Sequence, residues 1–102
     1  MHDDKVRVLM LGDVSGSAGM GALFLGLSSF VRERDIDFVI ANGENAAGGF
    51  GITESDFRTF RSMGVDVVTS GNHIWQKDEI LSVLDREDTI LRPINYPEPC
   101  HG

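Results

Sequence analysis

Three apolar segments of this 102-residue chain each end at a glycine, and polar groups suited to metal or acid–base chemistry follow at once. The segments end in Gly12-Asp13, in Gly43-Glu44-Asn45 and in Gly71-Asn72-His73. Carboxylate and amide oxygens suit hard divalent cations, and an imidazole titrates near neutral pH. The pattern indicates metal-assisted chemistry. The candidate ligands are Asp13, Glu44 and Asn72, and the candidate acid–base group is His73. Asn45 is either a further ligand or a donor to the substrate.

Each polar group has a structural alternative when it is taken alone. A single Gly-Asp after a strand is commonly a turn or a helix cap, and a single Asn-His pair is commonly a turn. The recurrence of the pattern at three successive segment ends favours one shared site. Glycine at each end would let the backbone turn sharply and approach a ligand closely.

The polar groups meet only if the segments before them are neighbouring parallel strands. Residues 6–11, 38–42 and 65–70 are apolar runs, which we expect to form these strands. Runs that are apolar on both faces are typical of sheets covered on both sides. In open α/β sheets, ligands bind at the carboxyl edge, where all three polar groups would emerge.

Helices are expected between the strands. After a small-residue loop at 14–19, apolar residues recur at helical spacing and predict a helix of about four turns; they are Met20, Leu23, Phe24, Leu27 and Val31. Thr53, with Asp56 three positions later, predicts the start of a second helix, and Gly64 predicts its end. The four phenylalanines at helical positions are expected in the core: Phe24, Phe30, Phe57 and Phe60.

A third helix is predicted over residues 78–84, with Ile80, Leu81 and Leu84 facing inward. Residues 90–92 predict a short fourth strand that Pro93 ends. The resulting order is β-α-β-α-β-α-β, an α/β fold with a mostly parallel sheet. Crossovers of one hand place all helices on one face if the strand order runs steadily. Either the strand order reverses, or a partner surface that covers the other face is missing.

Composition bounds the remaining classes of function. The formal charge of −7 argues against nonspecific binding to nucleic acid or an anionic membrane. Cys100 is the single cysteine, so an internal disulfide is excluded. The apolar runs are far shorter than a membrane span, and the acidic start is unlike a signal peptide. We therefore expect one domain at most and a cytoplasmic location.

Residues 12–19, 42–49 and 69–75 resemble the corresponding segments of the YmdB-like metallophosphoesterases, and residues 92–97 are similar to that family's next segment. The matches occur in order over most of the chain. The resemblance implies an αββα sandwich that hydrolyses phosphodiesters, including 2′,3′-cyclic nucleotides. It also implies two divalent metal ions, with Fe, Mn, Mg or Zn as the candidates.

By this resemblance Asp13, Glu44, Asn45 and Asn72 match metal ligands, with Glu44 bridging both ions. His73 matches the acid that protonates the leaving oxygen. Family members are more than twice as long, and their second half supplies further histidine ligands and the second sheet. The resemblance therefore implies that residues 1–102 are a partial domain, the amino-terminal half of such an enzyme. Little or no turnover is expected from the chain itself.

Other interpretations of the sequence stay open. The chain is alternatively a non-catalytic α/β module that binds a nucleotide or a protein partner, or a segment that self-associates into a homo-oligomer through its bare face. Ser15 and the amides of residues 14–19 are a hypothetical phosphate contact. Trp75 is either a pocket wall or a packing residue, and Lys77 either a phosphate contact or a solvated side chain.

Overall fold

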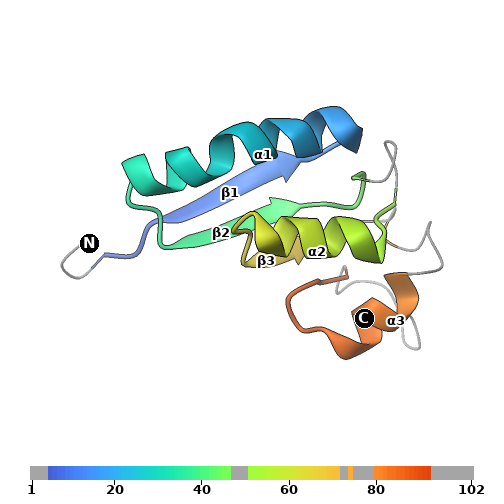
Figure 1. Cartoon of the computed structure of the whole chain (residues 1–102). Helices are drawn as coiled ribbons and strands as arrows, with labels where there is room; N and C mark the ends of the chain where they lie inside the picture. Colours follow the sequence, from blue (N-terminus) through green and yellow to red (C-terminus); the bar gives the residue numbers. More distant parts are fainter. Residues whose placement is uncertain (1–4, 47–50, 72–73, 75–79, 93–102) are drawn as a thin grey trace.

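The structure is a computed structural model that describes residues 5–46, 51–71, 74 and 80–92. Strands and helices alternate along these residues, as the sequence predicts (Figure 1). The elements are β1 (Val8–Asp13), α1 (Gly16–Glu33), β2 (Phe38–Asn42), α2 (Glu54–Ser62), β3 (Val67–Thr69) and α3 (Ile80–Arg86). The α/β fold class is therefore confirmed.

The three strands form one parallel sheet in the order β1-β2-β3. Beyond β3, Ile90 forms an isolated parallel bridge with Val68. The Val68 amide donates to the Thr89 carbonyl at 2.8 Å, and the Leu91 amide donates to the Val68 carbonyl at 2.9 Å. The prediction of a fourth strand over 90–92 is wrong in extent, because among these residues strand pairing is confined to this bridge. Pro93 is next in the chain, and a proline has no amide hydrogen to donate to a neighbouring strand.

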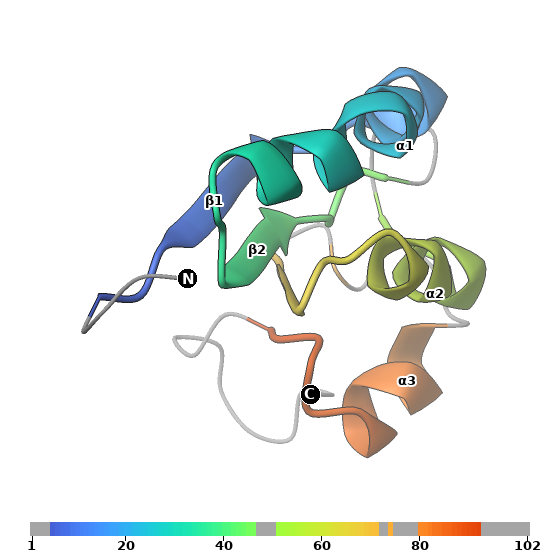
Figure 2. The same ribbon diagram turned by 60° about the vertical axis from the view of Figure 1, so that its left-hand side comes forward.

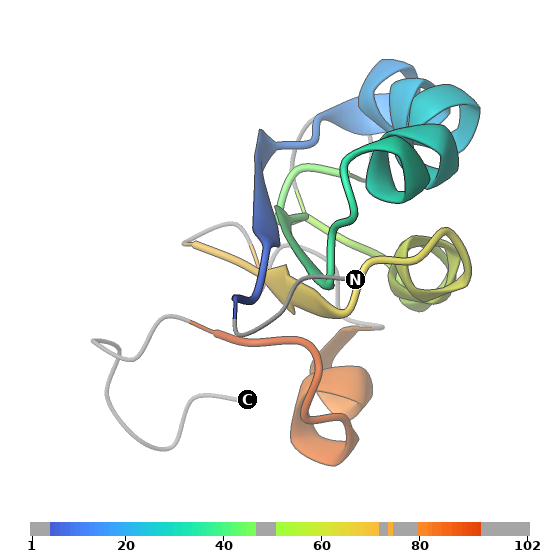
Figure 3. The same cartoon turned by 90° about the vertical axis from the view of Figure 1, so that its left-hand side faces the viewer.

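All three helices lie on one side of the sheet (Figures 2 and 3). Alternate strand residues face them and are buried, among them Val39, Ala41 and Val68. On the other face Val8 is 49% exposed and Met10 is 74% exposed. Because the described strands follow one another steadily, the alternative of a reversed strand order is wrong, and one sheet face is bare in the described part of the chain.

Helix α1 begins earlier than its sequence predicts. The expected loop over 14–19 is confined to residues 14–15, because residues 16–19 are helical. Glycine is needed at this junction because Gly16 has a φ of 61°, which other residues rarely adopt. Leu27 is buried and marks the face of α1 that is turned toward the sheet. Phe24 is 76% exposed and Phe30 is 40% exposed. The expectation that these two phenylalanines lie in the core is therefore wrong.

Helix α2 follows its sequence signals closely. Thr53 and Asp56 form a reciprocal capping box, in which the Asp56 amide donates to Thr53 Oγ1 at 3.0 Å. Gly64 ends the helix with a φ of 105°. Phe57 and Phe60 are buried, as predicted.

The other bounds differ by a few residues. Strand β1 runs past Gly12 to Asp13. Strand β3 is shorter than predicted because the Val65 amide still bonds the Phe60 carbonyl at the end of α2. Asp66 then exchanges two bonds with Val39: its amide donates to the Val39 carbonyl and its Oδ2 accepts from the Val39 amide, both at 2.8 Å. In α3 Ile80 and Leu84 are buried as predicted, while residues 78–79 and the side chain of Leu81 lie outside the described residues.

Candidate active site

A β-bulge places Asp13 at the carboxyl edge of the sheet. Leu11 pairs with Ala41, but Asp13 pairs with Asn42, so Gly12 is an extra residue in β1. Such bulges commonly re-aim a side chain next to a site. Asp13 therefore lies opposite Asn42. Without the bulge, Asp13 would follow Leu11 on the face of the strand that is turned toward the helices.

Glu44 and Asn45 lie in a tight turn directly after β2. The Ala46 amide donates to the Gly43 carbonyl at 3.1 Å, which closes the turn. Asn42 Oδ1 accepts from the Glu44 amide at 3.3 Å. The sequence argument missed this role of Asn42, although an Asn-Gly pair after an apolar run is a turn signal. The turn is also tied to β3, since the Gly43 amide donates to the Thr69 carbonyl at 3.0 Å.

Asp13 and Asn45 are in direct contact. Asn45 Nδ2 donates to Asp13 Oδ1 at 2.8 Å. The backbone around them is joined as well: the Val14 amide donates to the Asn42 carbonyl at 3.1 Å, and the Gly16 amide to the Asn45 carbonyl at 3.0 Å. The structure therefore brings together two predicted ligands that are 32 residues apart in sequence. Asn45 Oδ1 and Asp13 Oδ2 are the second polar atoms of the two side chains.

The third segment reaches Glu44 through Gly71. A methyl group on Gly71 would lie 2.9 Å from both Cδ and Oε2 of Glu44, and nearer still to Oε1. The backbone at the end of the β3 segment thus touches the Glu44 carboxylate. Asn72 and His73 follow Gly71 in the chain and lie outside the described residues, as do Trp75, Lys77 and Cys100.

The three segment-ending glycines serve three different purposes. Gly12 is the bulge residue, and a methyl group on it would meet nothing within 4 Å. A methyl group on Gly43 would lie 2.7 Å from Cε2 of the buried Phe60, whereas on Gly71 it would meet Glu44. None of the three is among the positive-φ glycines, although Gly43 is the first residue of the turn that the Ala46 amide closes.

The donor set suits a hard divalent cation. Asp13 and Glu44 offer carboxylate oxygens and Asn45 an amide oxygen. Within the described residues, no three His, Cys, Asp or Glu side chains come close enough to hold a metal ion. The proposed phosphate contact through residues 14–19 is weakened, since the Gly16 amide bonds Asn45 and the Gly19 amide bonds the Ser15 carbonyl at 3.1 Å.

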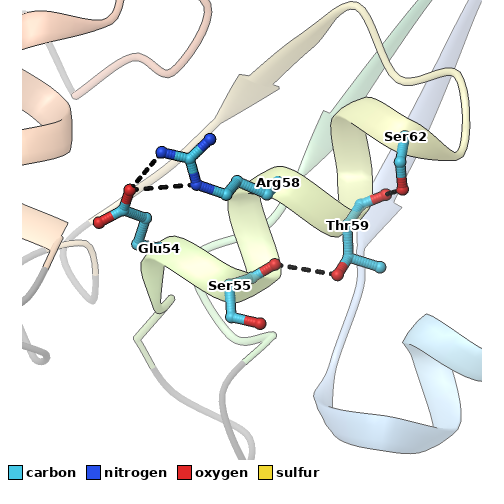
Figure 4. A pocket seen from close by; sticks show the side chains of 5 residues that line it. All are labelled: Glu54, Ser55, Arg58, Thr59 and Ser62. Atoms are coloured by element: carbon cyan, nitrogen blue, oxygen red, sulfur yellow. Dashed lines mark hydrogen bonds and ion pairs between the residues drawn. The ribbon is translucent and has the colours of Figure 1, made fainter.

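A second polar region, a shallow pocket along α2, involves none of the predicted site residues (Figure 4). Glu54 Oε2 lies 2.6 Å from Arg58 Nη2 and 3.0 Å from Arg86 Nη2 on α3. The hydrogen bond from Arg58, with further attraction from both arginines, lowers the pKa of Glu54. These contacts tie α3 to α2 and are structural.

The amino-acid sequence of the chain matches a known family. The family model described as YmdB-like protein matches residues 9–102, nearly the whole chain. The chain belongs to the YmdB-like family. A 2′,3′-cyclic-nucleotide 2′-phosphodiesterase from Bacillus subtilis (strain 168) is 38% identical over 95% of this chain and 37% of its own length.

Two solved structures are also similar to this chain. The structure of a hypothetical protein from Thermus thermophilus has a TM-score of 0.87 and 44% identity, over 95% of this chain and 37% of its own. A phosphatase structure from Mycoplasma pneumoniae has a TM-score of 0.85 and 30% identity, over 90% of this chain and 33% of its own. The YmdB-like family is thus one of phosphoesterase enzymes, and the chain spans about a third of its relatives' length. In the described part, no helix has the length and apolar character to span a membrane.

Proposed function

We propose that this chain supplies the amino-terminal part of a metal-dependent phosphodiesterase that acts on small phosphodiesters such as 2′,3′-cyclic nucleotides. Asp13, Glu44, Asn45 and Asn72 would hold two divalent metal ions, with Glu44 shared between them. His73 would donate a proton to the leaving oxygen. Residues 1–102 would then form one partial domain, and its bare sheet face would be covered by the rest of the enzyme.

The hydrogen bond between Asn45 and Asp13 carries this proposal. It joins two predicted ligands at the ends of two parallel strands, at the edge where α/β folds bind ligands. Gly71 brings the next strand end against the carboxylate of Glu44. The relatives named phosphodiesterase and phosphatase support the same reaction class.

The proposed chemistry divides between the metals and the side chains. Two bound cations would neutralise the phosphate and activate a water molecule as the nucleophile. Asp13, Glu44 and Asn45 would hold them through hard oxygen atoms on a rigid edge of the sheet. An imidazole one residue beyond Asn72 can protonate the leaving oxygen, because its ordinary pKa lies near neutral pH.

The first test is metal-dependent hydrolysis of 2′,3′-cyclic AMP by the longest natural form of the protein that contains this chain. Asn72→Ala and His73→Ala should each lower the rate at least about 100-fold, while Ser28→Ala on the exposed side of α1 should leave it unchanged. Unchanged rates in the first two variants would contradict the assigned roles. We expect little or no turnover from the 102-residue chain itself, and efficient turnover by it would contradict that expectation.

Binding without catalysis is the second candidate. A non-catalytic α/β module would bind a nucleotide or protein partner through its bare sheet face, on which Val8 and Met10 are exposed. Calorimetry in the presence of a chelator separates the two candidates. Binding of 2′,3′-cyclic AMP that needs no metal favours the module, and binding that requires Mn²⁺ favours the enzyme.

A further inference from the structure

Gly71 lies directly against the carboxylate of Glu44. A methyl group at position 71 would stand 2.9 Å from Glu44 Cδ and Oε2 and nearer still to Oε1, so something must shift. The backbone of Glu44 is held in place, because its amide is bonded to Asn42 Oδ1 and its turn is closed by the Ala46 amide. The Glu44 side chain is therefore the part that would have to move.

Space rather than backbone conformation requires glycine at position 71. Positive φ angles occur at Gly16, Gly51 and Gly64, and Gly71 is not among them. Gly64 is the opposite case, since its φ is 105° and a methyl group there would meet nothing within 4 Å. Gly71 is not held at a positive φ, and the three atoms nearest to a methyl group at position 71 all belong to Glu44, so Gly71→Ala tests the contact with Glu44.

Gly43 provides an internal comparison. A methyl group there would collide with hydrocarbon, at 2.7 Å from Phe60 Cε2 and 2.9 Å from Val68 Cγ1. The requirement at Gly43 therefore concerns core packing. At Gly71 the neighbour is the carboxylate of Glu44, which is a predicted metal ligand and precedes Asn45 in the chain, so the requirement concerns a candidate site residue.

The geometry points to Gly71 as a positioning residue for the Glu44 carboxylate. Because position 71 has no side chain, Glu44 can rest against the end of the β3 segment, and a larger residue pushes its carboxylate away. The consequence for metal binding rests on the proposed function: a displaced Glu44 cannot serve as the shared ligand. The contact itself does not depend on that function.

A double-mutant cycle followed by thermal unfolding in a chelator tests the contact in this chain. Gly71→Ala should lower Tm, by less than Gly43→Ala does, because the displaced atoms are the far end of the Glu44 side chain and not the buried core. Glu44→Ala should abolish that loss by removing the obstructing carboxylate. Glu44→Gln should not, because glutamine keeps the shape of glutamate. The inference is overturned if Gly71→Ala does not lower Tm. It is also overturned if Gly71→Ala lowers Tm equally in the unaltered chain, in Glu44→Ala and in Glu44→Gln, or if Glu44→Gln abolishes the loss as fully as Glu44→Ala does.

Two control variants and one binding measurement complete the experiment. The loss caused by Gly43→Ala should persist when Glu44→Ala is added, and Gly21→Ala should cost nothing, since a methyl group there meets no atom within 4 Å. Mn²⁺ titration should show Gly71→Ala binding about tenfold or more weakly than the unaltered chain. Unweakened Mn²⁺ binding overturns the positioning role. If the unaltered chain binds no Mn²⁺, the proposed metal site fails while the cycle still decides the contact.

Discussion

The bond between Asn45 Nδ2 and Asp13 Oδ1 is the interaction on which the candidate site depends. Hydrogen bonds to an ionised carboxylate are stronger than neutral ones. Two local features produce this one: the bulge at Gly12, which aims Asp13, and the turn at 43–46, which presents Asn45. Sequence spacing predicted the shared edge, but the bulge depends on strand register and has no mark in the sequence beyond a glycine.

Asn45→Asp should turn this attraction into repulsion. The variant loses the amide donor and sets a second carboxylate beside Asp13 Oδ1, so Tm at pH 7 should fall. The loss should shrink at pH 4, where part of the carboxyl population is protonated. Mn²⁺ should raise Tm more in the variant than in the unaltered chain, because a cation between two carboxylates relieves their repulsion.

The matched control for this prediction is Asn45→Ala, which removes the hydrogen bond without adding charge. Its loss of Tm should change less between pH 7 and pH 4 than that of the aspartate variant, because only a hydrogen bond is lost and no repulsion between carboxylates is added. Equal pH profiles for the aspartate and alanine variants would mean that Asp13 and residue 45 are not in contact.

Elements with strong local signals could be predicted from the sequence. Strand β2 has the expected bounds, and the Thr53 capping box and Gly64 mark α2 correctly. The start of α1 could not be predicted from the sequence, because Gly16 and Gly19 have low helix propensity and composition alone indicates a loop. Tertiary contacts decide it: the Gly16 amide bonds the Asn45 carbonyl and thereby anchors the first turn.

Removal of the Thr53 cap on α2 should destabilise the folded chain. Thr53→Ala removes the oxygen that accepts the Asp56 amide, and should lower the free energy of unfolding by about 1 kcal/mol. Thr59→Ala is the control, since Thr59 Oγ1 merely donates to the Ser55 carbonyl inside the helix. Urea unfolding curves measure both. Equal losses for the two variants would contradict a specific capping role.

The tie between α2 and α3 predicts a pH dependence. Arg58 and Arg86 favour ionised Glu54, so its pKa is lower in the folded chain than in the unfolded one. The stability from this contact is fully present above the ordinary pKa of about 4.5 and is lost as the pH falls through the lowered folded value. Glu54→Gln should lower Tm slightly at pH 6 and not at pH 2. A loss that persists unchanged at pH 2 would contradict the assignment, as would one insensitive to salt at pH 6.

At the scale of the molecule, the steady strand order leaves one sheet face bare within the described residues, which is one of the two alternatives that the sequence left open (Figure 3). Val8, Met10 and Phe38 are exposed on it, at 49%, 74% and 39%. The sequence could indicate this because all crossovers share one hand. It could not indicate the contact between Gly71 and Glu44, which depends on where a side chain lies relative to a distant backbone.

The bare face should make the isolated chain self-associate, because contiguous exposed apolar surface favours burial. Sedimentation velocity should show mass increasing with concentration. Met10→Lys should weaken this association, while Leu25→Lys on the outer side of α1, where Leu25 is 84% exposed, should not. Association abolished by Leu25→Lys and untouched by Met10→Lys would place the contact on the helix instead.

The proposed function requires that the carboxyl edge of this sheet binds divalent metal. Calorimetric titration of the 102-residue chain with Mn²⁺ tests it most directly, with Asp13→Ala, Glu44→Ala and Asn45→Ala beside Glu33→Ala on α1 as control. We predict weak binding that each of the three site variants lowers about tenfold or more and that Glu33→Ala leaves unchanged. The absence of Mn²⁺ binding, or equal affinity in all four variants and the unaltered chain, would contradict the account.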